Sequence, residues 1–203
     1  DDLYLGGTEV IVEGTINGDL MAAGEVVIIN GVVTGDLFVG GSSVTINGEV
    51  GDDLFAAAAS VTLGPSASIA DDVFSAGASI DMRAGSQVGG SVLLGAARGL
   101  IASAIAENLA AGTNSLRLEG TVDGDATIYV DASGNNYVPN FTYGSGSSIP
   151  MVSIPGGLTF GPDAKVTGLL EYTSPETVAV GSEIAAQVKH HLPPMDQEIA
   201  REI

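Results

Sequence analysis

Residues 18–34 read GDLMAAGEVVIINGVVT, and residues 35–51 read GDLFVGGSSVTINGEVG. The two stretches align without a gap, because each opens on Gly-Asp-Leu and carries aliphatic residues at the same later places. Self-similarity at a short fixed period is the signature of a repeat architecture. This pair of stretches therefore indicates a repeat fold for the chain.

The repeat extends well beyond these two stretches. We take the aspartate after the first glycine as the anchor of each unit, and the pattern recurs along most of the chain. Anchors occur at Asp2, Asp19, Asp36, Asp53, Asp72, Ser91, Asn108 and Asp125. Successive anchors are 17, 17, 17, 19, 19, 17 and 17 residues apart. This regular spacing indicates one structural unit repeated along the chain.

Each unit carries apolar residues at the same distances from its anchor. A branched aliphatic residue follows the anchor directly, as Leu20 does, and two more lie eight and ten residues after it, as Val27 and Ile29 do. Apolar residues recurring at every second position indicate strands with one buried face. Runs of small residues between them, such as 57–59, indicate tight corners.

A unit of this size cannot bury its own apolar face, but copies stacked about 4.8 Å apart form a continuous core. The sequence therefore predicts an all-β fold, a parallel β-helix (solenoid) of about 17-residue rungs. We expect the β-helix to span residues 1–188, with a C-terminal tail or cap at 189–203. The repeat breaks after Asp131 and resumes near residue 158, so residues 134–157 are expected to be an excursion inserted into one rung.

The composition restricts the possible partners. The formal net charge is −19, from 25 acidic and 6 basic side chains. Such a surface repels nucleic acid, anionic lipid and acidic polysaccharide. No apolar run approaches the roughly 20 residues of a membrane-spanning helix, so any membrane tether is expected outside this chain. The chain starts at Asp1, inside the repeat pattern, which indicates a piece of a longer protein.

Two recurring strings, DLYLGG at residues 2–7 and GTINGDL at residues 14–20, resemble the bactofilins and related polymer-forming bacterial β-helix proteins. The resemblance covers residues 2–130 well and residues 158–188 loosely. It implies a right-handed, single-stranded parallel β-helix that self-associates without a nucleotide or a metal. For the secreted or membrane-anchored branch it also implies an extracellular or cell-envelope location, with a cytoplasmic location as the alternative. The 134–157 excursion and the strong negative charge depart from a compact bactofilin.

The stacked anchors Asp19, Asp36, Asp53 and Asp72 raise the question of a calcium site. Calcium-binding β-rolls use the nonapeptide G-G-x-G-x-D-x-U-x, which does not occur in this sequence. Aspartate after glycine is typical of a turn in which the carboxylate accepts a hydrogen bond from nearby backbone. We therefore expect these residues to have a turn role and the chain to need no cofactor or metal.

The sequence offers little for catalysis. His190 and His191 are adjacent, so on a strand they point to opposite faces and cannot readily share a ligand. Stacked turns place carboxylates about 5–10 Å apart everywhere, so this spacing does not identify a glycosidase pair. We expect a structural scaffold and no enzyme, and a carbohydrate-binding or carbohydrate-active β-helix is the alternative. The 17-residue step also disfavours a left-handed hexapeptide acyltransferase helix.

A second apolar column lies two places after each anchor, where alternation points side chains away from the core. This apolar ladder consists of Tyr4, Met21, Phe38, Phe55, Phe74 and Leu93. It is either ordinary stacking of like side chains between rungs or a surface that a partner, another copy or the excursion covers. We expect its phenylalanines to be covered, foremost by apolar groups of the excursion. Those groups are Tyr137, Val138, Phe141, Tyr143, Ile149 and Met151.

The first rung is expected to carry the surface for self-association. Its strands present unpaired backbone groups over an exposed core, and such an open edge invites pairing with another copy. The residues of this N-terminal edge are Leu3, Leu5, Val10, Val12 and Ile16. We expect end-to-end or N-end to N-end dimers, or pairing of this edge with upstream residues.

Overall fold

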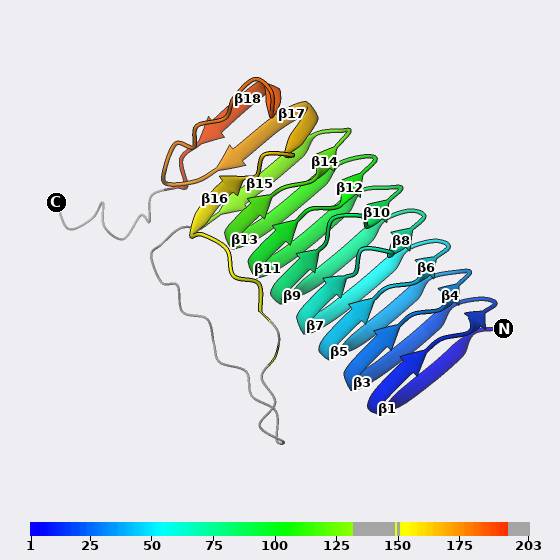
Figure 1. The fold of residues 1–203 in the computed structure, drawn as a ribbon. Helices are drawn as coiled ribbons and strands as arrows, with labels where there is room; N and C mark the ends of the chain where they lie inside the picture. The colour runs from blue at the N-terminus through cyan, green and yellow to red at the C-terminus, as the bar shows by residue number, and fades with distance from the viewer. Residues whose placement is uncertain (132–148, 150, 195–203) are drawn as a thin grey trace.

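The computed structural model describes residues 1–131, 149 and 151–194 (Figure 1). These residues form an all-β structure in which long and very short strands alternate. The ten-residue strands are β1 (Leu3–Val12), β3 (Leu20–Ile29), β5 (Leu37–Ile46), β7 (Leu54–Leu63), β9 (Val73–Met82), β11 (Val92–Ile101) and β13 (Leu109–Leu118). The two-residue strands are β2 (Thr15–Ile16), β4 (Val32–Val33), β6 (Glu49–Val50), β8 (Ser68–Ile69), β10 (Gln87–Val88), β12 (Ala104–Ile105) and β14 (Thr121–Val122). The other strands are β15 (Ala126–Val130), β16 (Gly157–Phe160), β17 (Lys165–Thr173) and β18 (Ala185–His191).

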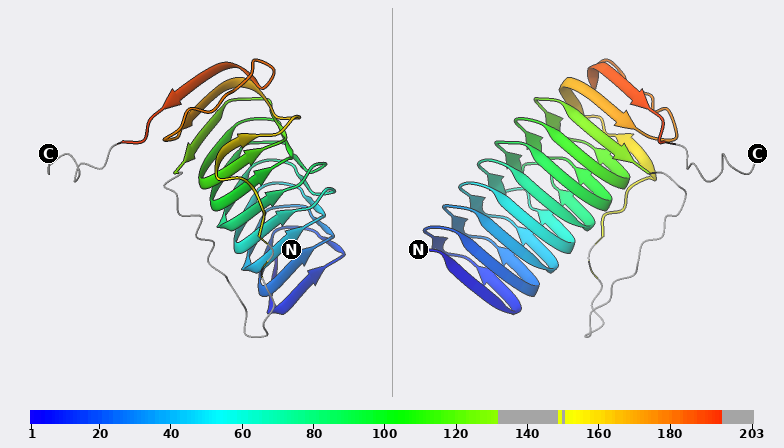
Figure 2. Two further views of the ribbon diagram at one scale, coloured as in Figure 1. Left: turned by 60° about the vertical axis from the view of Figure 1, so that its left-hand side comes forward. Right: turned by 180° about the vertical axis from the view of Figure 1, so that it is seen from behind.

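Each long strand pairs in parallel with the long strand of the next rung, and equivalent residues of the repeat lie side by side. Leu20 pairs with Leu37, and Leu37 pairs with Leu54. All three side chains are fully buried. The stack is a right-handed β-solenoid of about ten turns, drawn from blue to red in Figures 1 and 2. The predicted parallel, in-register β-helix is confirmed.

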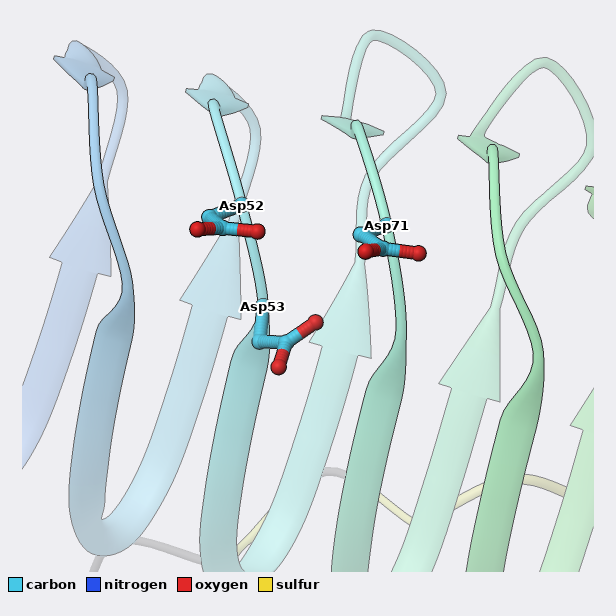
Figure 3. A group of neighbouring side chains, drawn as sticks. All are labelled: Asp52, Asp53 and Asp71. Atoms are coloured by element: carbon cyan, nitrogen blue, oxygen red, sulfur yellow. The ribbon is translucent and has the colours of Figure 1, made fainter.

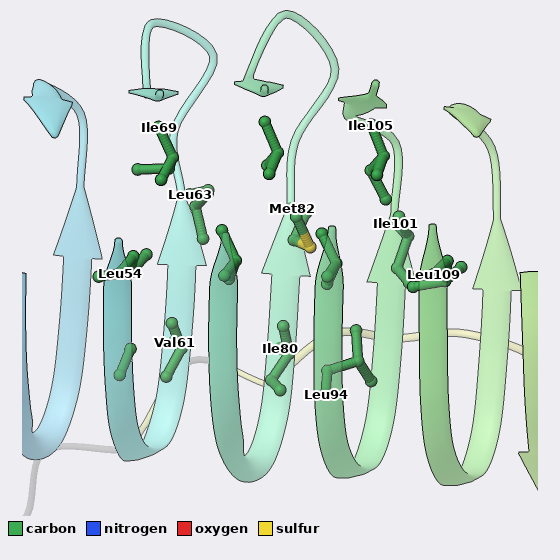
Figure 4. Close-up of a cluster of buried hydrophobic side chains, with 14 of the residues drawn as sticks. Leu54, Val61, Leu63, Ile69, Ile80, Met82, Leu94, Ile101, Ile105 and Leu109 are labelled. Carbon is green, nitrogen blue, oxygen red and sulfur yellow. The ribbon is translucent and has the colours of Figure 1, made fainter. Parts of the chain in front are cut away.

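Every long strand folds back on itself near its middle, so that its two halves form opposite walls of the solenoid. Figure 4 shows Leu54 on one wall of a rung and Val61 and Leu63 on the other, with their side chains between the walls. The bend carries mostly glycine and alanine, and the backbone conformation at some of its glycines leaves no room for a side chain. A Cβ added at Gly41 would lie 2.4 Å from the carbonyl oxygen of Gly24, which is closer than any real contact.

The core is one continuous column of aliphatic side chains between these walls. It extends from Val10 and Val12 in the first rung to Leu170 and Ala185 near the other end. Each fully buried aliphatic side chain contributes roughly 1.5–3 kcal/mol relative to exposure, so the repeated ladders account for the stability of the rod. The residues one, eight and ten places after each anchor are buried from Leu20 to Leu118, whereas Leu3 in the first rung is only partly buried.

The two walls carry different outer faces. We call the outer surface of the first half-strands, where the apolar ladder lies, the ladder face. The other is the serine face, named after the outward-pointing column one place before the first core residue of each second half-strand. That column comprises Glu9, Val26, Ser43, Ser60, Ser79, Arg98 and Ser115.

Two separate strands share the rung that follows β13. β15 pairs with Leu109–Thr113 of β13, and β16 pairs with Ser115–Leu118. The chain therefore leaves this rung after β15 and re-enters it at Gly157, whose φ of 79° lies in the left-handed region that favours glycine. Gly157, the last residue of the expected excursion, is already the first residue of β16.

The described end of the excursion lies on the serine face. The backbone N–H of Val152 donates a hydrogen bond to Ser79 Oγ at 2.9 Å, and Arg98 Nη1 donates to the Val152 carbonyl at 3.4 Å. The side chain of Ile149 is buried. In Figure 2 this stretch, in yellow, runs along the rungs before it enters β16.

At the C-terminal end, β18 pairs in parallel with β17 and crosses the expected domain boundary after residue 188. The His190 ring stacks on Tyr172 with a centroid distance of 4.7 Å. His191 Nε2 lies 2.8 Å from Glu171 Oε1. Both histidines thus contact the preceding rung. Residues 195–203 of the expected tail or cap lie outside the described residues.

Candidate interaction surface

The apolar ladder runs along six successive rungs on the outside of the solenoid. Its members pair in register, as Tyr4 with Met21 and Phe38 with Phe55 show. Tyr4 is 70% exposed, Met21 42% and Leu93 53%, whereas the three phenylalanines between them are half-buried. The ladder therefore leaves an apolar stripe on the surface of a strongly acidic chain.

The three phenylalanines of the ladder stack face to face. Ring centroids are 4.7 Å apart between Phe38 and Phe55 and 4.9 Å apart between Phe55 and Phe74, with interplanar angles of 4° and 3°. The centroid distances match the spacing of neighbouring strands, so the stack runs along the solenoid axis. Because the rings cover one another's faces, they present their edges to solvent as a continuous ridge.

Beside this ridge lies a column of small residues, four places after each anchor. This small-residue floor consists of Gly6, Ala23, Gly40, Ala57, Ala76 and Gly95. Ridge and floor together line an open groove of about 960 Å³, which follows the rungs from Tyr4 to Gly95. Strand alternation predicted the ridge but not the floor, although a glycine or alanine recurs at this place in each of the first seven units.

The described residues that line the groove include no charged side chain. In the six rungs that line the groove, the first half-strands, of which the first is Leu3–Gly7 and the last Val92–Ala96, have no Asp, Glu, Lys or Arg. Charged residues are thus absent from these half-strands although the whole chain has a net charge of −19. Large contiguous apolar patches on soluble proteins mark interaction surfaces.

The expected cover of the ladder by the excursion is not found in the described residues. Those that line the groove all belong to the rungs, and the described Val152 binds on the serine face instead. Tyr137, Val138, Phe141 and Tyr143, which were expected to supply the cover, lie outside the described residues.

The anchor aspartates form a second ladder, held by hydrogen bonds between rungs. Asp19 Oδ1 accepts the backbone N–H of Asp36 at 3.0 Å, and Asp36 Oδ1 accepts that of Asp53 at 3.1 Å. The pattern continues through Ser91 and Asn108 to the N–H of Leu169 on Asp125. The carboxylates accept backbone hydrogen bonds as predicted, but the donor lies in the next rung and not in the same turn.

Asp52, Asp53 and Asp71 form the one group of potential metal ligands found among the described residues (Figure 3). One carboxylate oxygen from each lies within 4.8 Å of the others. Loss of surrounding water, and then the charges of Asp72, Asp53, Asp52 and Glu107, raise the pKa of Asp71 above its ordinary value of 3.8. Calcium takes about 6–8 oxygen ligands, and Asp53 Oδ1 already accepts the N–H of Asp72 at 3.0 Å. Three exposed or half-exposed carboxylates do not by themselves define a metal site.

The N-terminal edge differs from the rungs behind it. Leu3 and Ile16 are partly exposed, whereas their equivalents one rung later, Leu20 and Val33, are fully buried. Val10 and Val12 are already buried, and Leu5 is half-buried. Among the described strands β1 pairs only with β3, so its other side offers unpaired backbone groups.

Comparison of the chain with protein-family models, with curated proteins and with solved structures gives no match. Within the described residues there is no helix of the length and apolarity needed to cross a membrane.

Proposed function

We propose that this chain is a non-catalytic structural scaffold, a self-associating, bactofilin-like β-helix at the bacterial cell envelope. Its partner is another copy of itself, through end-to-end or N-end contacts, and a longer form of the protein carries a membrane tether. The resemblance of the repeat to bactofilins supports this proposal, as does the acidic surface, which does not suit nucleic acid.

The observation that carries the proposal is the difference between the first and second rungs. Leu20 and Val33 have a rung packed against them on each side, while Leu3 and Ile16 have a rung on one side only. A further parallel or antiparallel strand on β1 would bury these side chains and pair the open backbone groups. A second copy of the same edge can supply such a strand, and so can residues upstream of Asp1 in a longer form of the protein.

A carbohydrate-binding ladder is the alternative, and the geometry of the ladder disfavours it. Sugars pack against the faces of aromatic rings, but Phe38, Phe55 and Phe74 cover one another's faces. The ridge offers ring edges, and the groove lacks the convergent carboxylates that a hydrolase needs.

The backbone direction at the edge allows a specific test. The carbonyl of Val12 accepts hydrogen bonds from rung two, so by alternation the N–H and carbonyl of Ile11 point to the open side. Ile11→Pro removes one donor from that side and keeps the pairing of β1 with β3, since proline is tolerated on the free side of an edge strand. Ile11→Thr is the matched control, because it changes the same exposed side chain and keeps the N–H.

We expect the parent chain to associate in light scattering as its concentration rises, Ile11→Thr to behave like the parent, and Ile11→Pro to associate less. Circular dichroism of all three proteins should show the same β-sheet spectrum. Equal association of the proline variant and the parent would remove the N-terminal edge as the interface, and a parent that stays monomeric would overturn the proposed self-association.

A further inference from the structure

The ladder face has a shape that can receive a copy of itself. The ridge of ring edges and the small-residue floor run parallel along the same six rungs, two residues apart in each strand. A two-fold axis parallel to the solenoid places the ridge of one copy over the floor of the other. Both copies have the same rung spacing, so ridge and floor match along their whole length.

The charge distribution indicates which surface two such acidic chains can bring together. Each copy carries a net charge of −19, so contact between most parts of the two surfaces brings carboxylates close to each other. Beside the N-terminal edge, Asp2, Glu9 and Glu13 lie within or next to β1. The ladder face is free of charge over six rungs, so desolvating it against a second copy buries no charged side chain.

The area of the face sets the strength of the contact. Five rung steps of about 4.8 Å and four residue steps of about 3.3 Å give a face of roughly 24 by 13 Å, or about 300 Å². Stable dimers bury about 800 Å² per partner, and smaller interfaces belong to weak, transient complexes. The face therefore suits a reversible contact that forms at high local concentration.

We infer that the ladder face is a lateral interface between two copies of this chain, arranged in parallel with rung against rung. This inference rests on the proposed self-association and adds a second interface to the end contact. Two parallel rods present their N-terminal edges at the same end, so a lateral pair can still meet another pair end to end. Because the rods repel elsewhere, salt strengthens the lateral contact by screening that repulsion.

The test uses two variants of one strand of the full chain. Phe38 and Thr45 both lie on β5, both point outward and both are half-buried, but Phe38 is on the ladder face and Thr45 is on the serine face. Phe38→Glu places a charge in the proposed interface, and Thr45→Glu places the same charge outside it. Sedimentation velocity over a range of concentration and salt is the readout. We expect Phe38→Glu to weaken the salt-promoted dimer at least tenfold and Thr45→Glu to change its dissociation constant less than twofold.

Cross-linking gives an independent readout that does not depend on stability. The chain has no cysteine, so Ala57→Cys on the floor and Thr45→Cys on the serine face each introduce a single thiol. A short bis-maleimide should join two copies of Ala57→Cys, increasingly so at high salt, and should join Thr45→Cys far less. Equal cross-linking of the two variants would overturn the lateral interface.

The outcomes separate this inference from the N-terminal one. Association that survives Phe38→Glu but is lost with Ile11→Pro overturns the lateral interface and leaves the proposed function standing. Association that survives Ile11→Pro but is lost with Phe38→Glu supports the lateral interface alone. A parent chain that stays monomeric at high salt, yet binds dodecyl maltoside through the groove, overturns the second copy as the occupant.

Discussion

The serine face and the ladder face are built on the same rungs and the same core, yet they meet solvent in opposite ways. On the serine face Ser79 is 1% exposed and bonds to the chain's own returning segment at Val152. On the ladder face Leu93 is 53% exposed, and the described residues beside it belong to the rungs alone. Within the described part of the chain, the polar face is covered and the apolar face is left open.

Apolar side chains thus have two roles in this solenoid, packing of the core and formation of an exposed surface. The core between the walls is already complete without the ladder, because the core residues that flank each ladder position are buried from the second rung onward. The ladder residues therefore add modestly to the fold and mainly supply a surface.

The largest expected effect comes from neighbouring residues on opposite sides of one wall. Leu54→Ala should lower the free energy of unfolding by about 2–5 kcal/mol, because it leaves a cavity in a fully buried column. Phe55→Ala should lower it by about 1–2 kcal/mol, mostly through two lost ring contacts. Urea denaturation of both variants measures the difference. An equal or larger loss of stability for Phe55→Ala would contradict the modest role of the ladder in the fold, because the ladder would then be part of the stabilising core.

The aspartate ladder should show the next largest effect. Asp36→Ala leaves the half-buried N–H of Asp53 without its acceptor and should lower the free energy of unfolding by about 1–3 kcal/mol. Asp36→Asn keeps an acceptor, as Asn108 does naturally for Asp125 at 3.0 Å, and should match or exceed the parent because it removes a charge from the column. Thermal unfolding at low salt compares the two. A destabilised Asn variant would show that the charge itself is needed.

A smaller effect is expected on the serine face. Ser79→Ala removes one acceptor from the returning segment and should lower the free energy of unfolding by about 0.5–1.5 kcal/mol. The amide of Val152 should then exchange its hydrogen faster, because its bond to Ser79 Oγ is gone. Phe74→Ala, on the same strand but on the ladder face, is the control and should leave that exchange rate unchanged. Faster exchange in the Phe74 variant would mean that the two faces are coupled.

The smallest effect concerns pH and the Asp71 carboxyl. Its pKa is raised in the folded state above the ordinary 3.8, so the folded chain binds this proton more tightly than the unfolded chain. The charged form therefore opposes folding above the folded pKa, and this opposition disappears as the pH falls to the ordinary value. Asp71→Asn should raise the melting temperature slightly at neutral pH and have no effect below pH 3.8. Glu176→Gln, which removes an exposed charge elsewhere, is the control, and an equal gain from it would mean that only net charge matters.

The repeat made most of the fold predictable from the sequence. Anchor spacing identified the rungs, and alternation placed Leu20, Leu37 and Leu54 inside and Phe38 and Phe55 outside. Anchor spacing and strand alternation predict burial because every rung packs its side chains in the same way. Two kinds of contact join residues that are far apart in the sequence, so the repeat pattern did not predict them. The carboxylates from Asp2 to Asp72 accept hydrogen bonds from the next rung, 17 or 19 residues later in the sequence. The end of the excursion is held on the serine face by the bond from Val152 to Ser79, 73 residues earlier.

The first five rungs of the aspartate ladder also form a line of charge along the rod. Their carboxylates recur once per rung, about 4.8 Å apart, and at that distance two charges in water repel by about 0.9 kcal/mol, more than the thermal energy of about 0.6 kcal/mol. A linear polyelectrolyte of this kind accumulates a diffuse sheath of cations along its length, as nucleic acids do, without needing a chelating pocket. Monovalent salt should therefore act on this edge through ionic strength more than through the identity of the cation.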